Sequence, residues 1–286
     1  MKKGIAALLV LVMAACIFVG CAEERGFLPE YDIEGCVSRM GEGSLQDVGG
    51  VDFDPMLWID GEYTLPYRLY IPASYDETRE YPLLLFLHGA GERGDDNLQP
   101  VITYAGLDSF FDEEDDPARE AIVLIPQCPV GDMWVDVDAS EKGMYSIESV
   151  PESAAMSAVL KLIKFTVSDL SVDTARIYAM GMSMGGYGTW DILARHTDLL
   201  AAAVPICGGC DVSRAEAIKE IPVRTFHGAL DPIVPPDGTR AMAAALEGAG
   251  AADFSYTEYA DGMHDIWNRA MQTEGLDDWL FAQKKE

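Results

Sequence analysis

Short, mostly uninterrupted apolar runs alternate with longer amphipathic segments over most of the 286 residues. Continuous apolar runs suit strands that are covered on both faces, whereas apolar positions three and four residues apart predict helices with one buried face. Their alternation predicts an α/β fold with a mostly parallel central sheet and helices on both faces. The expected strands are 64–72, 81–89, 121–129, 175–181, 200–209, 223–231 and 254–260, and the expected helices are 150–170, 184–196, 236–250 and 265–283, the last with a break near Gly275.

The first 20 residues differ from this pattern and are typical of a secretory signal peptide. Two lysines precede an apolar stretch without charges, residues 4–20, after which the chain turns polar. The letters FVGC resemble a bacterial lipobox and make Cys21 the expected lipidated N-terminus, with Cys16 in MAAC as a second, shorter candidate. A retained membrane anchor is the alternative. In either case the rest of the chain is expected outside the cytoplasm, attached to the bacterial cell envelope.

The remainder divides by composition. Residues 21–57 are rich in glycine and acid and lack clear periodicity, which indicates a tether and N-terminal extension. Residues 58–286 carry the alternating pattern and are expected to form the catalytic domain. The chain has 20 basic and 48 acidic residues, a formal charge of −28. Because like charges repel, this balance disfavours nucleic acid and anionic membrane surfaces as partners.

One cysteine motif needs an explanation. With Cys16 in the predicted signal and Cys21 predicted to be lipidated, the C-G-G-C sequence at Cys207 and Cys210 stands out. Outside the cytoplasm it could be two buried thiols after a strand, a local disulfide or a redox pair, and the sequence leaves all three open. No second C-x-x-C and no paired histidines accompany it, so a zinc site is not expected.

The strongest chemical motif is GMSMG at residues 181–185, a G-x-S-x-G match between an expected strand and an expected helix. This nucleophile elbow is a tight turn that lifts the serine hydroxyl, here that of Ser183, clear of the sheet. Glycines weaken a helix start. The glycines at this helix start are explained by the space that they leave, because side chains at Gly181 and Gly185 would collide across the turn. Gly186 in turn lets the helix approach its neighbours.

A serine hydroxyl is a weak nucleophile at neutral pH and needs a base, which in turn needs a carboxylate. In this fold the acid and then the histidine follow the serine along the chain. His264 lies after the last expected strand and is the predicted base, since His227 leaves no room for an acid before it. Asp231 directly follows its strand and is the predicted acid. The competing carboxylates are Asp211, Asp253, Asp261 and, most seriously, Asp237, which is better placed to cap the next helix.

Two backbone amides are needed to stabilise the negative oxygen of the tetrahedral intermediate. One is expected from Met184, next to the nucleophile. The other is expected from the small residues of LHGAGERGDDN after an early strand, with Ala90 first and Gly91 second. His88 in the same loop is expected to hold the loop by hydrogen bonds.

Taken together, these segments resemble the α/β-hydrolase superfamily, within its group of secreted esterases akin to polyhydroxybutyrate depolymerases, feruloyl and acetyl xylan esterases and dienelactone hydrolase-like proteins. The resemblance covers residues 63–283, in the segments LPYRLYIP, LLLFLHGAGERGDDN, IPQCPVGDMWVD, RIYAMGMSMGGYGTW, FHGALDPIVP and GMHDIW. It implies an α/β-hydrolase fold, catalytic roles for Ser183, Asp231 and His264, and a place for Trp134 near the pocket mouth. No long insertion follows residues 202–206, so no large lid is expected.

The resulting hypothesis is an extracytoplasmic, lipid-anchored serine carboxylesterase that acts on short-acyl or aromatic esters, free or linked to polymers. By resemblance, plant polysaccharides are the expected polymers. This chemistry requires no metal and no organic cofactor. One alternative is a peptidase of the prolyl oligopeptidase type, whose large propeller domain has no room in residues 21–57. The other is a non-catalytic lipoprotein that binds a glycan or lipid, which the loss of a triad residue would have favoured. The sequence leaves the oligomeric state open.

Overall fold

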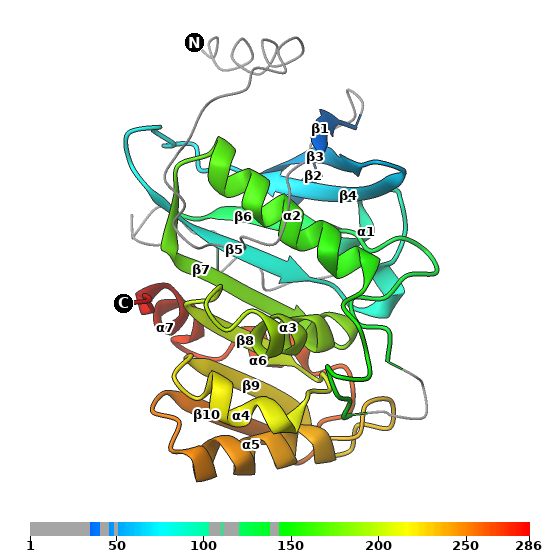
Figure 1. Cartoon of the computed structure of the whole chain (residues 1–286), viewed down its shortest axis with the longest axis vertical. Coiled ribbons are helices and arrows are strands. Elements are labelled where there is room, and N and C mark those ends of the chain that lie inside the picture. Colours follow the sequence, from blue (N-terminus) through cyan, green and yellow to red (C-terminus); the bar gives the residue numbers. More distant parts are fainter. Residues whose placement is uncertain (1–34, 41–45, 49–50, 103–109, 111–119, 138–142) are drawn as a thin grey trace.

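The computed structural model describes residues 35–40, 46–48, 51–102, 110, 120–137 and 143–286, and all structural statements concern these. A single mixed sheet runs through them in the order β1-β3-β4-β6-β5-β7-β8-β9-β10, with β2 paired to β3 (Figure 1). The strands are β1 (Cys36–Arg39), β2 (Gln46–Val48), β3 (Val51–Asp60), β4 (Tyr63–Tyr70), β5 (Tyr81–Leu87), β6 (Ile122–Pro126), β7 (Val172–Met182), β8 (Ala202–Ile206), β9 (Val223–Gly228) and β10 (Phe254–Tyr259).

The helices follow the sequence pattern closely. They are η1 (Ala90–Glu92), α1 (Gln99–Ile102), α2 (Ala154–Asp169), α3 (Met184–Arg195), η4 (Val212–Arg214), α4 (Ala215–Ile218), α5 (Asp237–Ala249), α6 (Trp267–Met271) and α7 (Leu276–Ala282). The expected break in the last helix occurs at Gly275, whose φ of 70° lies in the left-handed region that favours glycine. Each of the seven strands and four helical segments expected from the sequence is present.

Two kinds of strand pairing divide the sheet. From β6 through β5, β7, β8 and β9 to β10, each neighbouring pair is parallel. The strands β1, β3, β4 and β6 pair antiparallel instead. The predicted α/β fold with a mostly parallel sheet is confirmed, and the antiparallel part is an addition at one edge.

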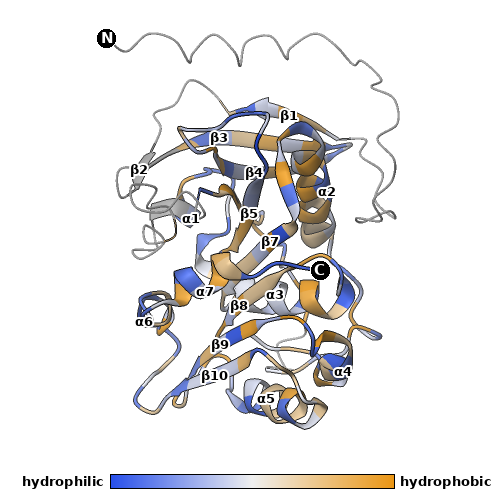
Figure 2. Cartoon of the chain, turned by 90° about the vertical axis from the view of Figure 1, so that its left-hand side faces the viewer, coloured by the Kyte–Doolittle hydropathy of each residue, from blue (hydrophilic) through white to orange (hydrophobic). Residues whose placement is uncertain are grey.

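Helices cover both faces of the parallel strands, which explains the uninterrupted apolar runs. On β7, Ile177 and Ala179 belong to a buried cluster with residues of α2 to α5, whereas Tyr178 and Met180 belong to one with residues of α6 and α7. Figure 2 shows α6 and α7 on one side of the strands and α2, α4 and α5 on the other. Successive residues of a strand point to opposite faces, so both must be apolar when both faces are covered.

The N-terminal extension is more than a tether, which corrects the prediction for residues 21–57. Within it, β1 and most of β3 are part of the sheet, and β3 crosses the expected domain boundary at residue 58. Trp58 is fully buried and packs against Phe165 of α2 with ring centroids 5.5 Å apart. The predicted signal peptide and Cys21 lie outside the described residues, among which no helix is both long enough and apolar enough to span a bilayer.

Candidate active site

The turn between β7 and α3 holds Ser183 in an unusual backbone conformation. Its φ and ψ are 53° and −117°, a region that non-glycine residues rarely occupy and that costs about 1–3 kcal/mol. Hydrogen bonds fix the turn: the Ser183 amide donates to the Ile206 carbonyl at 2.8 Å, and the Tyr187 amide donates to the Ser183 carbonyl at 3.0 Å. The half-buried serine side chain therefore stands at the end of β7, apart from the helix that follows.

Neighbouring glycines make this turn sterically possible, as the sequence predicted. A Cβ on Gly181 would lie 2.4 Å from the Gly185 carbonyl oxygen, across the turn. A Cβ on Gly185 would lie 1.9 Å from the carbonyl oxygen of Leu87, and one on Gly186 would lie 2.4 Å from that of Ile206. Real Cβ atoms do not approach other atoms so closely. The three glycines thus allow the elbow to pack against the ends of β5 and β8.

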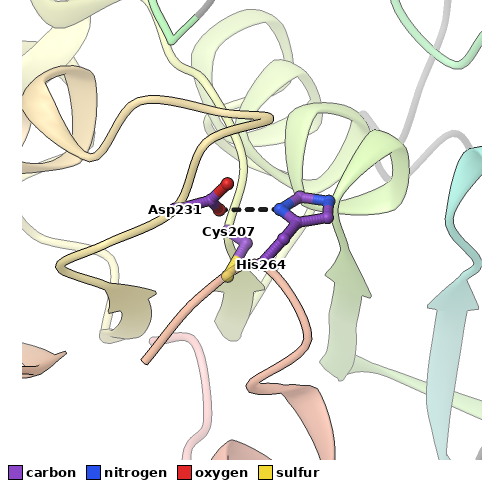
Figure 3. A group of neighbouring side chains, drawn as sticks. All are labelled: Cys207, Asp231 and His264. Atoms are coloured by element: carbon purple, nitrogen blue, oxygen red, sulfur yellow. Dashed lines mark hydrogen bonds and ion pairs between the residues drawn. The ribbon is translucent and has the colours of Figure 1, made fainter. Parts of the chain in front are cut away.

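A chain of two short hydrogen bonds links the predicted triad. The Ser183 Oγ lies 2.7 Å from His264 Nε2. His264 Nδ1 lies 2.6 Å from Asp231 Oδ2, the bond that Figure 3 shows as a dashed line. Because Nδ1 faces a carboxylate, it carries the imidazole proton, which leaves Nε2 free to accept the serine proton. The geometry brings together the three residues that the sequence placed in catalytic roles.

The Asp231 carboxylate is held ionised in a buried position. Burial alone would raise its pKa, but hydrogen bonds from His227, His264 and two backbone amides hold the pKa well below its usual range. The amides of Ile233 and Val234 donate to Asp231 Oδ1 at 2.8 and 2.9 Å. A permanently charged carboxylate is what the imidazolium needs when His264 takes up a proton.

Each competing carboxylate has other hydrogen-bond partners. Asp237 is exposed and binds Arg240 at 2.8 Å. The partners of the other three are Ser213 and Ile147 for Asp211, Trp279 for Asp253 and Arg269 for Asp261. Asp231 is the carboxylate that binds His264.

The two amides predicted for the oxyanion belong to segments that touch. Met184 is the first residue of α3, where helix amides have no intrahelical partner, and the Ser183 side chain does not cap this end. Ala90 begins η1 in the loop after β5, whose first residues abut the elbow at Gly185. Gly91 is exposed, and nothing lies within 4 Å of the position of a Cβ on it. The amides of Met184 and Ala90 are thus candidates to face an ester bound at Ser183.

A sequence model of the phospholipase/carboxylesterase family matches residues 74–274, more than half of the chain. The chain belongs to this family. It is 24% identical over 177 residues to a protein of Aspergillus terreus named "Probable feruloyl esterase C", covering 62% of this chain and 58% of that protein. It is 25% identical over 153 residues to the bifunctional acetylxylan esterase/xylanase XynS20E of Neocallimastix patriciarum, covering 54% of this chain and 20% of that one.

A solved structure supports the same relationship. The crystal structure of a thermostable esterase has a TM-score of 0.71 and 35% identity to this chain, and the match covers 82% of this chain and 63% of that one. The matched part thus spans less than two thirds of the thermostable esterase and of the Aspergillus terreus protein. The resemblance to α/β-hydrolase esterases that the sequence suggested is confirmed.

The loop after β5 is held in this family member by a buried histidine and tryptophan. His88 Nδ1 donates to the Gly89 carbonyl at 2.6 Å, and His88 Nε2 accepts from the Cys128 amide at 2.9 Å. Burial lowers the pKa of His88 to about 4, so the imidazole is neutral at pH 7. Trp134 donates through Nε1 to the His88 carbonyl at 3.0 Å and is fully buried. Its predicted place at the pocket mouth is therefore wrong, because the indole supports the loop from inside.

The C-G-G-C motif contains two free thiols that face different neighbours. Cys207 has a φ of 48° and follows β8, and its sulfur lies within 4.8 Å of an Asp231 carboxylate oxygen. Cys210 Sγ donates to the Gly238 carbonyl at 3.5 Å. Gly208 and Gly209 are needed here, since Cβ atoms on them would lie 2.3 Å from Gly186 and 2.2 Å from the Tyr187 ring.

Sequence reasoning missed a second histidine beside the triad carboxylate. His227 is fully buried, with Nε2 3.3 Å from Asp231 Oδ2 and 3.0 Å from the Val234 carbonyl. Both neighbours are acceptors, so Nε2 carries a proton, while Nδ1 lies 2.8 Å from Thr239 Oγ1. The spacing in the sequence could have revealed this contact, because His227 is the last but one residue of β9 and lies four residues before Asp231. At the level of the sequence, His227 was considered only as a base.

Proposed function

We propose that this chain is a serine carboxylesterase that works through an acyl-enzyme. The hydrogen-bond chain from Ser183 Oγ through His264 to Asp231, on a strained strand-to-helix turn, is the observation that carries the proposal. The positive φ of Ser183 separates its hydroxyl from the helix, so the oxygen can approach a carbonyl carbon. Membership of the phospholipase/carboxylesterase family supports an ester as substrate.

In this mechanism Ser183 Oγ attacks the ester carbonyl carbon while its proton passes to His264 Nε2. The negative oxygen of the tetrahedral intermediate accepts hydrogen bonds from the Met184 and Ala90 amides. As the intermediate collapses, His264 returns the proton to the leaving alcohol. Water then attacks the acyl-enzyme with the same histidine as base, which restores Ser183 and releases the acid. Asp231 keeps its negative charge throughout and stabilises the imidazolium.

Neutral esters are the substrates that the charge balance favours. With a formal charge of −28, the protein repels anionic lipid surfaces and polyanions. A neutral carboxylic ester carries no such penalty. The names of two relatives, a feruloyl esterase and an acetylxylan esterase, support aromatic or short acyl groups, including those carried by polysaccharides.

We also propose that the chain acts outside the cytoplasm, anchored to the cell envelope through a lipid on Cys21. The basic start, the apolar stretch and the lipobox-like FVGC letters support this. Metabolic labelling with a fatty-acid probe should label the full chain. The variant Cys21→Ser should not be labelled. Equal labelling of both proteins would exclude Cys21 as the lipidated residue, and Cys16→Ser then tests the second candidate.

A fluorophosphonate probe tests the nucleophile directly. The full chain should be labelled covalently, whereas Ser183→Ala should lose the label completely. Ser168→Ala, which removes an exposed hydroxyl from α2, is the matched control and should be labelled like the parent. Labelling that persists in Ser183→Ala, or its absence in the parent, would exclude the proposed nucleophile.

Substrate class follows from a panel of p-nitrophenyl esters of increasing acyl length, methyl ferulate, acetylated and feruloylated xylan, and short peptides. Turnover of neutral esters with little peptide cleavage is expected. Preferential cleavage of peptides would replace the esterase proposal by a peptidase that uses the same triad.

A further inference from the structure

Two side chains of the triad, those of Asp231 and His264, lie close to a third side chain with a different donor atom, the thiol of Cys207. Cys207 follows β8, Asp231 follows β9 and His264 follows β10, and Figure 3 shows Asp231 and His264 facing each other with Cys207 beside them. The sulfur, a carboxylate oxygen and an imidazole nitrogen lie within 4.8 Å of one another. The proposed reaction uses the carboxylate and the imidazole, but it gives no task to the thiol.

This donor set fits one class of ligand. Thiolate, imidazole and carboxylate together are the ligands of Zn²⁺ and of softer thiophilic cations such as Cd²⁺, whereas Mg²⁺ and Ca²⁺ prefer oxygen alone. Zinc bonds of about 2.0–2.3 Å in a tetrahedron place neighbouring donor atoms about 3.5 Å apart. The sulfur therefore has to approach the other two donor atoms by about 1.3 Å at most, and Asp231 Oδ2 and His264 Nδ1, now 2.6 Å apart, have to separate by about 0.9 Å. Three protein ligands would leave the fourth position for water.

The thiol is held in place for such a role. Cys207 has a φ of 48°, where glycine would be less strained, and its amide donates to the Phe226 carbonyl at 2.9 Å. Burial and the neighbouring Asp231 raise the pKa of the Cys207 thiol to about 12. The thiol is thus protonated and poorly reactive at neutral pH, but a bound cation displaces the proton of a coordinating thiol.

We propose that Cys207, Asp231 and His264 form an inhibitory site for a thiophilic divalent cation. The cation binds the sulfur, one Asp231 oxygen and His264 Nδ1. The thiol proton passes to solvent, and the imidazole proton moves from Nδ1 to Nε2, so the ring stays neutral and Nε2 can no longer accept the Ser183 proton. The His264–Asp231 hydrogen bond is then broken, and the imidazole can no longer act as an oriented base for Ser183. Inhibition rests on the proposed esterase function, whereas binding of the cation does not.

Binding is tested with Cd²⁺, because a cadmium–thiolate bond absorbs in the ultraviolet and reports the sulfur directly. The full chain is used with Cys36→Ser as background, which removes the exposed thiol of β1. A saturable band with one Cd²⁺ per chain is expected, and it should be lost in Cys207→Ala. It should be lost also in Cys207→Gly, whose backbone accepts the positive φ. Cys210→Ala removes a buried thiol of the same motif and should keep the band.

Inhibition is tested with Zn²⁺ and Cd²⁺, each variant being compared with its own rate in the presence of a chelator. Half-inhibition of Cys207→Ala should need at least about tenfold more metal than that of the parent. Cys210→Ala should respond like the parent, and Mg²⁺ should leave each protein uninhibited. Ser183→Ala, inactive in the esterase proposal, should bind Cd²⁺ like the parent, so the binding result stands even if no ester is hydrolysed.

Three results would overturn the proposal. The first is a thiolate band that persists in both Cys207 variants or disappears in Cys210→Ala. The second is the absence of a saturable band in the parent. The third is binding of Cd²⁺ through Cys207 with no loss of esterase activity, which would show that the cation leaves the His264–Asp231 pair intact.

Discussion

The parallel and antiparallel parts of the sheet differ in where their strands end. Strands β7, β8, β9 and β10 are parallel, so their carboxyl ends meet at one edge, and Ser183, Cys207, Asp231 and His264 all follow those ends. In the antiparallel part, successive strand ends fall on opposite edges, so chemistry cannot collect there. What this part contributes is buried surface, with Trp58 and Leu65 fully buried. Activity and stability should therefore respond to substitutions in different places.

The largest effect is expected at the parallel edge. In Asp231→Asn the amide oxygen can still accept the bonds from Ile233 and Val234, but the negative charge beside His264 is lost. We expect kcat to fall about 10⁴-fold, or about 5 kcal/mol in activation free energy, with little change in melting temperature. Steady-state kinetics and thermal unfolding measure the two. Asp237→Asn, at the nearest competing carboxylate, should retain full activity, and equal losses in both variants would contradict the assignment of the acid.

In the antiparallel part the expected effect is on stability alone. Trp58→Ala removes a fully buried indole of β3 that packs against Phe165, and should lower the free energy of unfolding by about 3–5 kcal/mol. Denaturant titration gives the loss, and kcat/KM of the folded fraction should not change. Trp58→Phe keeps a ring in this place and should recover part of the stability. A large loss of kcat/KM in folded Trp58→Ala would show that the two regions are coupled.

This comparison also explains what the sequence could predict. In the parallel part most strands are apolar runs, although β10 (FSYTEY) is not, and each candidate residue lies within five residues of a strand end, so both fold and triad were visible. By contrast, β3 has the sequence VDFDPMLWID, in which acids and a proline interrupt the apolar residues. It lies near the edge and gains its burial from α2, about 100 residues later in the chain. The places of Cys207 and Trp134 could not be predicted in this way. They depend on which side of a loop each side chain faces, and residue spacing does not encode that.

His88 lies in the loop after β5, and its effect should depend on pH. Burial lowers its pKa to about 4 in the folded state, against 6.5 as the ordinary value. Above pH 6.5 the imidazole is neutral in both states, so protonation contributes nothing. As the pH falls from 6.5 towards 4, only the unfolded state takes up the proton, so the folded state should lose about 3 kcal/mol relative to it.

His88→Gln removes this titration. The difference in unfolding free energy between pH 7 and pH 4 should therefore be smaller in the variant than in the parent by about 3 kcal/mol. Denaturant titrations of both proteins at the two pH values measure the difference. Equal acid sensitivity of the two proteins would mean that His88 takes up its proton without unfolding, contrary to its burial.

The smallest effect is expected at His227, which touches the triad only through Asp231. In His227→Gln, Asp231 loses or weakens one of its four hydrogen-bond donors, and a carboxylate with fewer donors stabilises the His264 imidazolium more strongly. The carboxylate is also positioned less firmly, so we expect kcat to fall about tenfold, or about 1.4 kcal/mol, while the stronger stabilisation of the imidazolium moves the acidic limb of the kcat/KM profile to higher pH. His196→Gln is the matched control, because it alters a histidine–carboxylate pair with Glu152 at the far end of α3. A purely structural role for His227 would lower the melting temperature and leave the pH profile unchanged, so an unshifted profile would remove its positioning role.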